Sequence, residues 1–515
     1  MPRPHGKRLA ALAVFICLLA GPAGAAPAPV VRVESGALSG DRTGRILVYR
    51  GIPYAAAPVG QLRWRPPAPA LRWSGVRRAE RFGPACAQPV AVDGAPNFGG
   101  YSGPSSEDCL TLNVWTPARA SAAPVMVWIH GGGHRFGAAS MPLYDGAAFA
   151  RDGVVLVSFN YRLGGLGYFA HPALTAEASP RQPLGDYGLM DEIAALAWVR
   201  RNIAAFGGDP ARVTVFGQSS SAIDVQALMA IPAASALFRQ AIVESGGSWV
   251  EPTGLAAREA DGLKLAAAAG LTGGAVPAAA LRKLPASALF DPGFTLDFQP
   301  FLDGRLLVRT STQAFACWRA SAKPLVIGSN SFEGAVARDF SGIADLAAKL
   351  GSLYPGGGKG EAALRALDGD RFFGAPTRWV AARNARRAPT WLYRFSYVPE
   401  ALRGVLPGAP HGFETPFVFD SWDVMPAVMR AAFSGSPAGP TAQDRAMTAR
   451  IHGCWVAFAK SGRPDCEGAP AWPAYDSRSD RLMEFGANTG VRAGLDKLRD
   501  DAIEQVVLPD LLRAP

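Results

Sequence analysis

The chain has 515 residues, 49% of them hydrophobic, and its 58 glycines and 43 prolines follow no fixed period. This composition excludes a fibrous or disordered protein and suits a single large α/β domain with insertions. The formal net charge of +10 is scattered without a dense Lys/Arg block, so we expect a basic solvated surface and no nucleic-acid partner.

The first predicted element is a secretory signal peptide over residues 1–26. Basic residues precede an apolar run, Leu9–Ala20, and a small-residue stretch leads to a cleavage site after Ala25 or Ala26. The alternative is an uncleaved membrane anchor, but about 12 apolar residues are few for a bilayer span. We therefore expect a secreted or periplasmic protein whose mature chain, 27–515, forms one α/β domain without a stable membrane span.

Five of the six cysteines follow residue 26, and export would allow them to be oxidised. Cys86 and Cys109 would close a short loop, which stabilises a fold by about 3 kcal/mol in the loop-entropy model. The odd number leaves at least one cysteine unpaired within the chain, and whether Cys454 pairs with Cys466 stays open. The spacings do not resemble a zinc pattern, so no metal site is expected.

Several apolar runs predict buried strands. Because most runs are continuous rather than alternating, they favour a parallel sheet with helices on both faces. The runs are Val125–Ile129, Val154–Asn160, Val213–Phe216, Ala241–Glu244, Pro324–Gly328 and Trp391–Tyr397.

Helical patterns lie between these runs, and together they predict the α/β class. In Met190–Phe206 apolar residues recur every three or four positions, and the pair Gly207–Gly208 ends the helix. The Ala-rich stretches 250–320 and 340–390 are predicted as helical excursions from the sheet that frame the entrance to a site.

Two motifs follow predicted strands and point to a serine nucleophile. In "VWIHGGGHRFG" (127–137) three glycines expose backbone N–H groups that could bind an oxyanion, although a flexible turn is the simpler alternative. In "FGQSSSA" (216–222) the stretch from Gly217 to Ser221 matches the strand-to-helix pattern G-x-S-x-G except at its last position.

With these motifs, the chain resembles the type-B carboxylesterases, the α/β-hydrolase family that includes cholinesterases and bacterial p-nitrobenzyl esterases. The resemblance extends over essentially the whole chain after the signal. It is carried by "YRGIPYAAAPVGQLRWRPP" (49–67), "SSEDCLTLNVWTP" (105–117), "VWIHGGGHRFG", "NYRLGGLGYF" (160–169), "GDYGLMDEIAALAWVRRNIAAFGGDPARVTVFGQSSSA" (185–222), "FRQAIVESGGS" (238–248) and "WVAFAKSGRPD" (455–465).

The resemblance implies an α/β-hydrolase fold and a Ser-Glu-His triad. Ser219 would be the nucleophile, His411 in "GAPHGFETPFVF" (408–419) the base, and Glu333 in "SNSFEGA" (329–335) the acid that orients it. Asp339 is the competing acid. The backbone N–H groups of Gly132, Gly133 and Ser220 would form the oxyanion hole, and Ser245 would support the histidine by hydrogen bonding.

Three positions depart from the family pattern. Ser221 replaces a glycine, for which we expect a local adjustment that keeps the turn. Gln218 replaces a common glutamate and argues weakly against choline esters. His134 stands where Phe or Tyr is common, so it either touches substrate or fills the place of the aromatic ring.

These features predict hydrolysis of small-molecule carboxylic esters through an acyl-enzyme, with no cofactor. Two alternatives remain at this point: a catalytically inactive binding protein of the same fold, and an acyltransferase that uses the same triad. The native ester and the oligomeric state stay open.

Overall fold

The structure is a computed structural model that describes residues 29–90, 94–97, 99–247, 249–272, 276–291 and 295–513. The predicted signal peptide lies outside these residues. No helix within them is long and apolar enough to cross a membrane.

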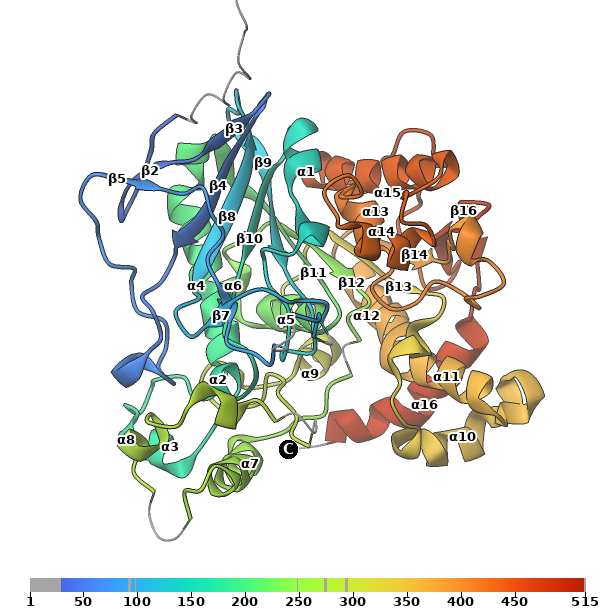
Figure 1. The fold of residues 1–515 in the computed structure, drawn as a ribbon. Helices are drawn as coiled ribbons and strands as arrows, with labels where there is room; N and C mark the ends of the chain where they lie inside the picture. Colours follow the sequence, from blue (N-terminus) through green and yellow to red (C-terminus); the bar gives the residue numbers. More distant parts are fainter. Residues whose placement is uncertain are drawn as a thin grey trace, which may run out of the picture.

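An 11-stranded mixed sheet forms the centre of the described chain (Figure 1). Its parallel part runs from β10 to β15, and antiparallel strands extend it at both edges. In spatial order the strands are β16 (Gly490–Ala493), β15 (Arg481–Phe485), β14 (Thr390–Phe395), β13 (Leu325–Asn330), β12 (Gln240–Glu244), β11 (Gly208–Gln218), β9 (Ala123–Ile129), β10 (Val155–Phe159), β8 (Thr111–Pro117), β4 (Ile46–Pro53) and β3 (Asp41–Thr43).

The predicted strands are all confirmed, and they form the parallel part of this sheet except for its last strand, β15. The sequence prediction omitted β15 and the antiparallel edge strands. It also omitted two small sheets, which contain β1 (Val31–Val33), β2 (Gly36–Ser39) and β5 (Val76–Arg78), and β6 (Ala85–Cys86) and β7 (Ser105–Ser106).

Helices cover both faces of the sheet (Figure 1). The helices of the described residues are α1 (Ala147–Arg151), α2 (Gly164–Gly167), α3 (Pro172–Glu177), α4 (Tyr187–Asn202), α5 (Ser220–Ala230), α6 (Pro232–Ser235), α7 (Leu255–Ala268), α8 (Ala278–Leu281), α9 (Ser311–Ala316), α10 (Ala344–Leu350), α11 (Glu361–Gly369), α12 (Ala375–Ala385), α13 (Thr415–Phe419), α14 (Ala427–Ser434), α15 (Ala442–Ser461) and α16 (Lys497–Arg513).

The two faces of β9 show how the core is divided. Because successive side chains of a strand point to opposite faces, Val125, Val127 and Ile129 pack into a core shared with α4, α5 and α12. Met126 and Trp128 pack on the other side, in a core shared with α1, α13 and α15. A strand that is buried on both faces needs a continuous apolar run, which is the pattern that predicted it.

The predicted helix at 190–206 is present as α4 with a following 3-10 turn, Ile203–Phe206. Gly207 ends it with a φ of 80°, a left-handed conformation that glycine adopts without strain. The excursions 250–320 and 340–390 are helical as predicted: α7 and α8 lie at the lower left of Figure 1, and α10 and α11 at the lower right.

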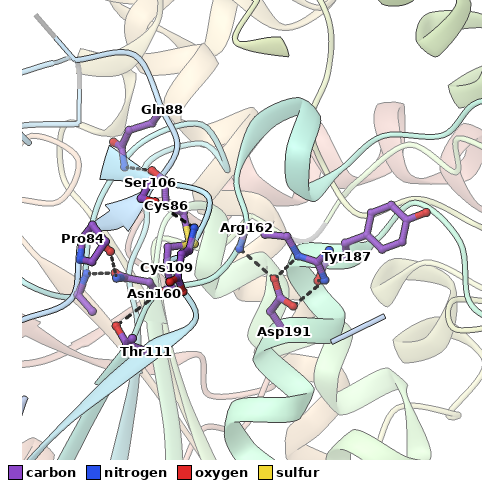
Figure 2. Close-up of a disulfide and its surroundings, with 12 residues drawn as sticks. Pro84, Cys86, Gln88, Ser106, Cys109, Thr111, Asn160, Arg162, Tyr187 and Asp191 are labelled. Carbon is purple, nitrogen blue, oxygen red and sulfur yellow. Dashed lines mark hydrogen bonds and ion pairs between the residues drawn. A yellow bond between two sulfur atoms is a disulfide. The ribbon is translucent and has the colours of Figure 1, made fainter. Parts of the chain in front are cut away.

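Two disulfides join parts of the described chain. Cys86 pairs with Cys109, as predicted, and Cys454 pairs with Cys466, while Cys317 is free and exposed. Figure 2 shows the first disulfide near the buried ion pair of Arg162 and Asp191, whose Nε and Oδ2 atoms are 2.7 Å apart. This part of the N-terminal half is therefore crosslinked both covalently and electrostatically.

Candidate active site

Ser219 occupies the turn between β11 and α5. Its φ of 64° and ψ of −129° lie outside the regions that non-glycine residues favour, so the turn is strained. The side chain is partly exposed and makes no capping hydrogen bond to α5. A strained turn that leaves a serine hydroxyl unused at a strand-to-helix junction has the geometry of a nucleophile elbow.

The loop after β9 packs directly against this turn. A Cβ atom on Gly131 would lie 2.5 Å from the backbone oxygen of Gln218 and 3.2 Å from Cβ of Ser219, so only glycine permits the close approach. Gly132 and Gly133 have φ values of 120° and 63°, which side chains other than hydrogen disfavour. The three predicted oxyanion donors thus lie on two adjoining segments: the glycine loop, and Ser220, whose N–H has no intrahelical partner because it begins α5.

His411 and Glu333 are in contact. Nδ1 of His411 lies 2.6 Å from Oε2 of Glu333; the His411 side chain is 9% exposed and the Glu333 side chain 2%. Burial disfavours the imidazolium, but the charge of Glu333 and its hydrogen bond outweigh burial and raise the pKa of His411 above its ordinary value. The carboxylate thereby orients the ring and leaves Nε2 as the atom that can accept a proton.

The other oxygen of Glu333 is held by two donors. Ser245 Oγ donates to Oε1 at 2.5 Å and the backbone N–H of Asn330 donates at 2.6 Å. Ser245 therefore supports Glu333 directly, whereas the sequence resemblance suggested a hydrogen bond to the histidine. Its own backbone is in the left-handed region, with a φ of 50° at the end of β12.

Nε2 of His411 faces Gln218 rather than a serine hydroxyl. The side-chain nitrogen of Gln218 lies 3.1 Å from it, and among the described residues no hydrogen bond joins Ser219 to the ring. The Ser219–His411 hydrogen bond that the implied triad would use is therefore not formed in this structure. Such bonds are often long before substrate binds, and Ser219 adjoins the residue that contacts the ring.

The remaining departures from the family pattern are explained locally. Ser221 is fully buried, accepts a hydrogen bond from the Gln218 N–H at 3.0 Å, and lies 2.7 Å from the Ile129 oxygen, to which it donates. This hydroxyl ties the end of β9 to the elbow, which keeps the turn as expected. His134 is also fully buried, so its ring occupies the interior of the protein.

The competing residues lie elsewhere. Asp339 is exposed and accepts hydrogen bonds from Ser341. His171 caps the start of α3, and His452 on α15 interacts with Asp152. His130 contacts the Gly131 oxygen, and burial lowers its pKa to about 4. His5 lies outside the described residues.

Two polar residues of the site were missed by sequence reasoning. Glu414 is buried beside His411 and Glu333, where burial and the charge of Glu333 raise its pKa to about 7. Asn330 donates to the Pro410 oxygen at 2.7 Å and also hydrogen-bonds Glu414, which docks the His411 loop onto the Glu333 loop. The sequence held a signal for Glu414, because this carboxylate lies three residues after His411 in the same motif.

The 340–390 excursion reaches the site at one ring. Phe373 packs against His411 with ring centroids 4.7 Å apart. A histidine that has one nitrogen on a carboxylate and a hydrophobic ring beside it can serve as a general base for a serine once its other nitrogen is released from the Gln218 amide.

Comparisons with known proteins agree with this chemistry. The model of the carboxylesterase family matches residues 27–347 and 357–503. The chain is 37% identical to a fumonisin B1 esterase of Sphingopyxis macrogoltabida, covering 91% of this chain and 88% of the relative. It is 34% identical to a para-nitrobenzyl esterase of Bacillus subtilis, with coverages of 88% and 94%. A solved structure of a PNB esterase superposes with a TM-score of 0.81 at 32% identity, covering 92% and 99%.

Proposed function

Because this chain belongs to the carboxylesterase family and has its α/β-hydrolase fold, it is a serine hydrolase of carboxylic esters, and we propose that Ser219, His411 and Glu333 carry the reaction. The observation that carries this assignment is the 2.6 Å contact between His411 and Glu333 beside the strained turn at Ser219. The family comparison favours neither the binding-protein nor the acyltransferase alternative.

The proposed mechanism has two halves. His411 Nε2 takes the hydroxyl proton as Ser219 Oγ attacks the ester carbonyl, and the resulting oxyanion is stabilised by the amides of Gly132, Gly133 and Ser220. The imidazolium then gives its proton to the departing alcohol, which leaves an acyl-serine. In the second half His411 takes a proton from water, the hydroxide attacks the acyl group, and Ser219 regains its proton as the acid leaves.

The contact between Gln218 and His411 would have to break during this reaction. Because its amide occupies the direction of Nε2 at 3.1 Å, rotation of the side chain or of the ring would open that nitrogen to Ser219. The side chain is neutral, so its withdrawal leaves no charge unpaired.

We also infer that the protein is exported. The supports are the pattern of residues 1–26 and the two disulfides, which persist in oxidising compartments. N-terminal sequencing of the protein recovered outside the cytoplasm would give a first residue near position 27 if this inference is right.

A panel of esters would identify the acyl and alcohol groups that the protein accepts. Two relatives carry names that mention fumonisin B1 and para-nitrobenzyl esters, and we propose these two ester types as the first arms of the panel. Further arms vary acyl length and charge, since the chain has a formal net charge of +10.

The catalytic assignment is tested by labelling and by substitution. A fluorophosphonate should label the wild-type protein at Ser219, and Ser219→Ala should remove both labelling and hydrolysis of p-nitrophenyl acetate. Ser220→Ala is the matched comparison: it keeps the proposed oxyanion N–H and removes only the hydroxyl that accepts from the His134 N–H at 3.3 Å, so labelling at Ser219 should persist. Absence of an adduct on the wild type, or retained labelling in Ser219→Ala, would contradict the assignment.

A further inference from the structure

His134 links the glycine loop to the helix that follows the proposed nucleophile. Its ring is fully buried, and Nε2 lies 2.8 and 3.0 Å from the two carboxylate oxygens of Asp224. Asp224 lies on α5 and is also fully buried. The pair therefore joins the loop that ends at residue 137 to the helix that begins at Ser220.

The backbone of His134 is tied to the same surroundings. Its N–H donates to Ser220 Oγ at 3.3 Å, and its carbonyl accepts from the Gly164 N–H at 2.7 Å. Its φ of 56° places a non-glycine residue in the left-handed region, at a cost of about 1 kcal/mol. A residue persists in this conformation only when its neighbours hold it there, and here the side chain and both backbone groups are held.

A second buried carboxyl completes the cluster. Glu192 on α4 is fully buried, and burial together with the neighbouring Asp224 charge raises the pKa of Glu192 well above its ordinary range. A neutral Glu192 adds no second negative charge beside Asp224. Asp224 thus has polar neighbours from both the loop and α4.

Core packing alone does not account for this pair. A phenylalanine would fill the space of the imidazole ring, whereas burying a histidine and an aspartate together costs desolvation that their attraction repays only in good geometry. What the pair adds is a directional bond between the two segments that carry the proposed oxyanion donors.

We propose that the His134–Asp224 pair fixes the glycine loop against the start of α5, so that His134 and Asp224 are positioning residues for the oxyanion hole. This inference rests on the proposed function, since it assigns a purpose to the amides of Gly132, Gly133 and Ser220. A displaced loop would weaken binding of the tetrahedral oxyanion more than binding of the ground-state ester, so kcat falls and KM changes little.

The test compares variants of Asp224 in the full-length protein. Asp224→Ala should lower kcat for p-nitrophenyl acetate about tenfold or more with KM within about threefold, since one oxyanion donor is worth roughly a hundredfold. The rate of fluorophosphonate labelling should fall by a similar factor, because the phosphonyl oxygen uses the same amides. Asp224→Asn keeps an acceptor for the imidazole N–H and should recover most of both rates.

The double variant His134→Phe/Asp224→Ser leaves no charge buried without a partner, so it decides the question if Asp224→Ala does not fold. It should show the same loss of kcat and labelling while folding cooperatively. His452→Phe is the matched control: His452 is a second buried histidine, with Nε2 3.1 Å from Asp152, and its loss should lower stability but not kcat.

Failure of the positioning role can be distinguished from failure of the proposed function. A wild type that is labelled and active, together with a folded double variant of unchanged kcat and labelling rate, overturns the positioning role and leaves the proposed function standing. A wild type that the fluorophosphonate does not label overturns the proposed function, and this inference with it.

Discussion

Gln218 places its side-chain nitrogen 3.1 Å from Nε2 of His411, the atom that the proposed mechanism uses as a base. Gln218 directly precedes Ser219, and a Cβ atom on Gly412 would lie 3.5 Å from the same amide nitrogen. A charge introduced at position 218 would therefore act on His411 through a direct contact.

Gln218→Glu should shift the pH profile of kcat/KM. A carboxylate at this distance stabilises the imidazolium, which raises the pKa of His411 beyond the rise that Glu333 already causes. Because the base must be neutral, activity would be lost at a higher pH as the pH falls, and the acid limb moves upward. Rates on an uncharged p-nitrophenyl ester across the acid limb measure the shift.

Gln218→Met is the matched control for that prediction. It removes the amide without adding charge, so its acid limb should stay within a few tenths of a unit of the wild type. An equal shift in both variants would show that loss of the amide, and not the added charge, moves the profile.

Glu333→Gln should lower kcat by about 10⁴-fold with little change in KM, because the amide no longer selects the tautomer with a free Nε2 or stabilises the imidazolium. Stopped-assay rates on an activated ester measure the loss. Asp339→Asn, which changes the exposed competing carboxylate, should leave kcat unchanged. The reverse pattern would transfer the acid role to Asp339.

Ser221→Ala should destabilise the protein by about 1–2 kcal/mol, since the buried N–H of Gln218 loses its acceptor and the Ile129 oxygen loses a donor. Urea unfolding measures the free energy. Activity below the unfolding transition should remain within about fivefold of the wild type, because the hydroxyl holds the turn and does not react. A loss of activity equal to that of Ser219→Ala would contradict this separation of roles.

The two disulfides should contribute to stability according to the length of the loop that each closes. Cys86→Ser/Cys109→Ser, which opens the bond with a separation of 23 residues, should lower the free energy of unfolding by about 3 kcal/mol. Cys454→Ser/Cys466→Ser, with a separation of 12, should cost slightly less. Both are measured by urea unfolding of the non-reduced proteins.

Cys317→Ser is the control for the disulfide series, since Cys317 is free and exposed. Its effect should stay within about 0.5 kcal/mol. A Cys86→Ser/Cys109→Ser variant as stable as this control would show that the first disulfide adds nothing to the folded state.

The parallel strands were predictable because each is buried on both faces, which demands a local run of apolar residues such as Val125–Ile129. The antiparallel strands were harder to predict because their buried polar residues find partners only in the fold. Asn113 in β8 accepts from the Gly51 N–H at 3.0 Å and donates to Ser158 Oγ at 3.1 Å. Thr116 in the same strand donates to the Phe206 oxygen at 2.7 Å.

The candidate site likewise has parts that a local sequence pattern predicts and parts that only the fold brings together. Ser219 and the glycines at 131–133 were predictable because a tight turn or loop imposes its small residues over a few consecutive positions. The residues Gln218, Ser221 and His134 were recognisable only as departures from a pattern. Their partners, His411, Ile129 and Asp224, are far away in the sequence and close in the fold.

The sequence by itself determined the family and its ester chemistry, since the proposed nucleophile elbow, the glycine loop and the histidine motif are each local patterns. Only the tertiary structure decided how these parts contact one another: Ser245 with Glu333, Gln218 with His411, and His134 with Asp224. The physical reason is that a hydrogen bond requires its two atoms to be placed to within a few tenths of an ångström, and only chain folding sets that distance for residues that no local pattern relates.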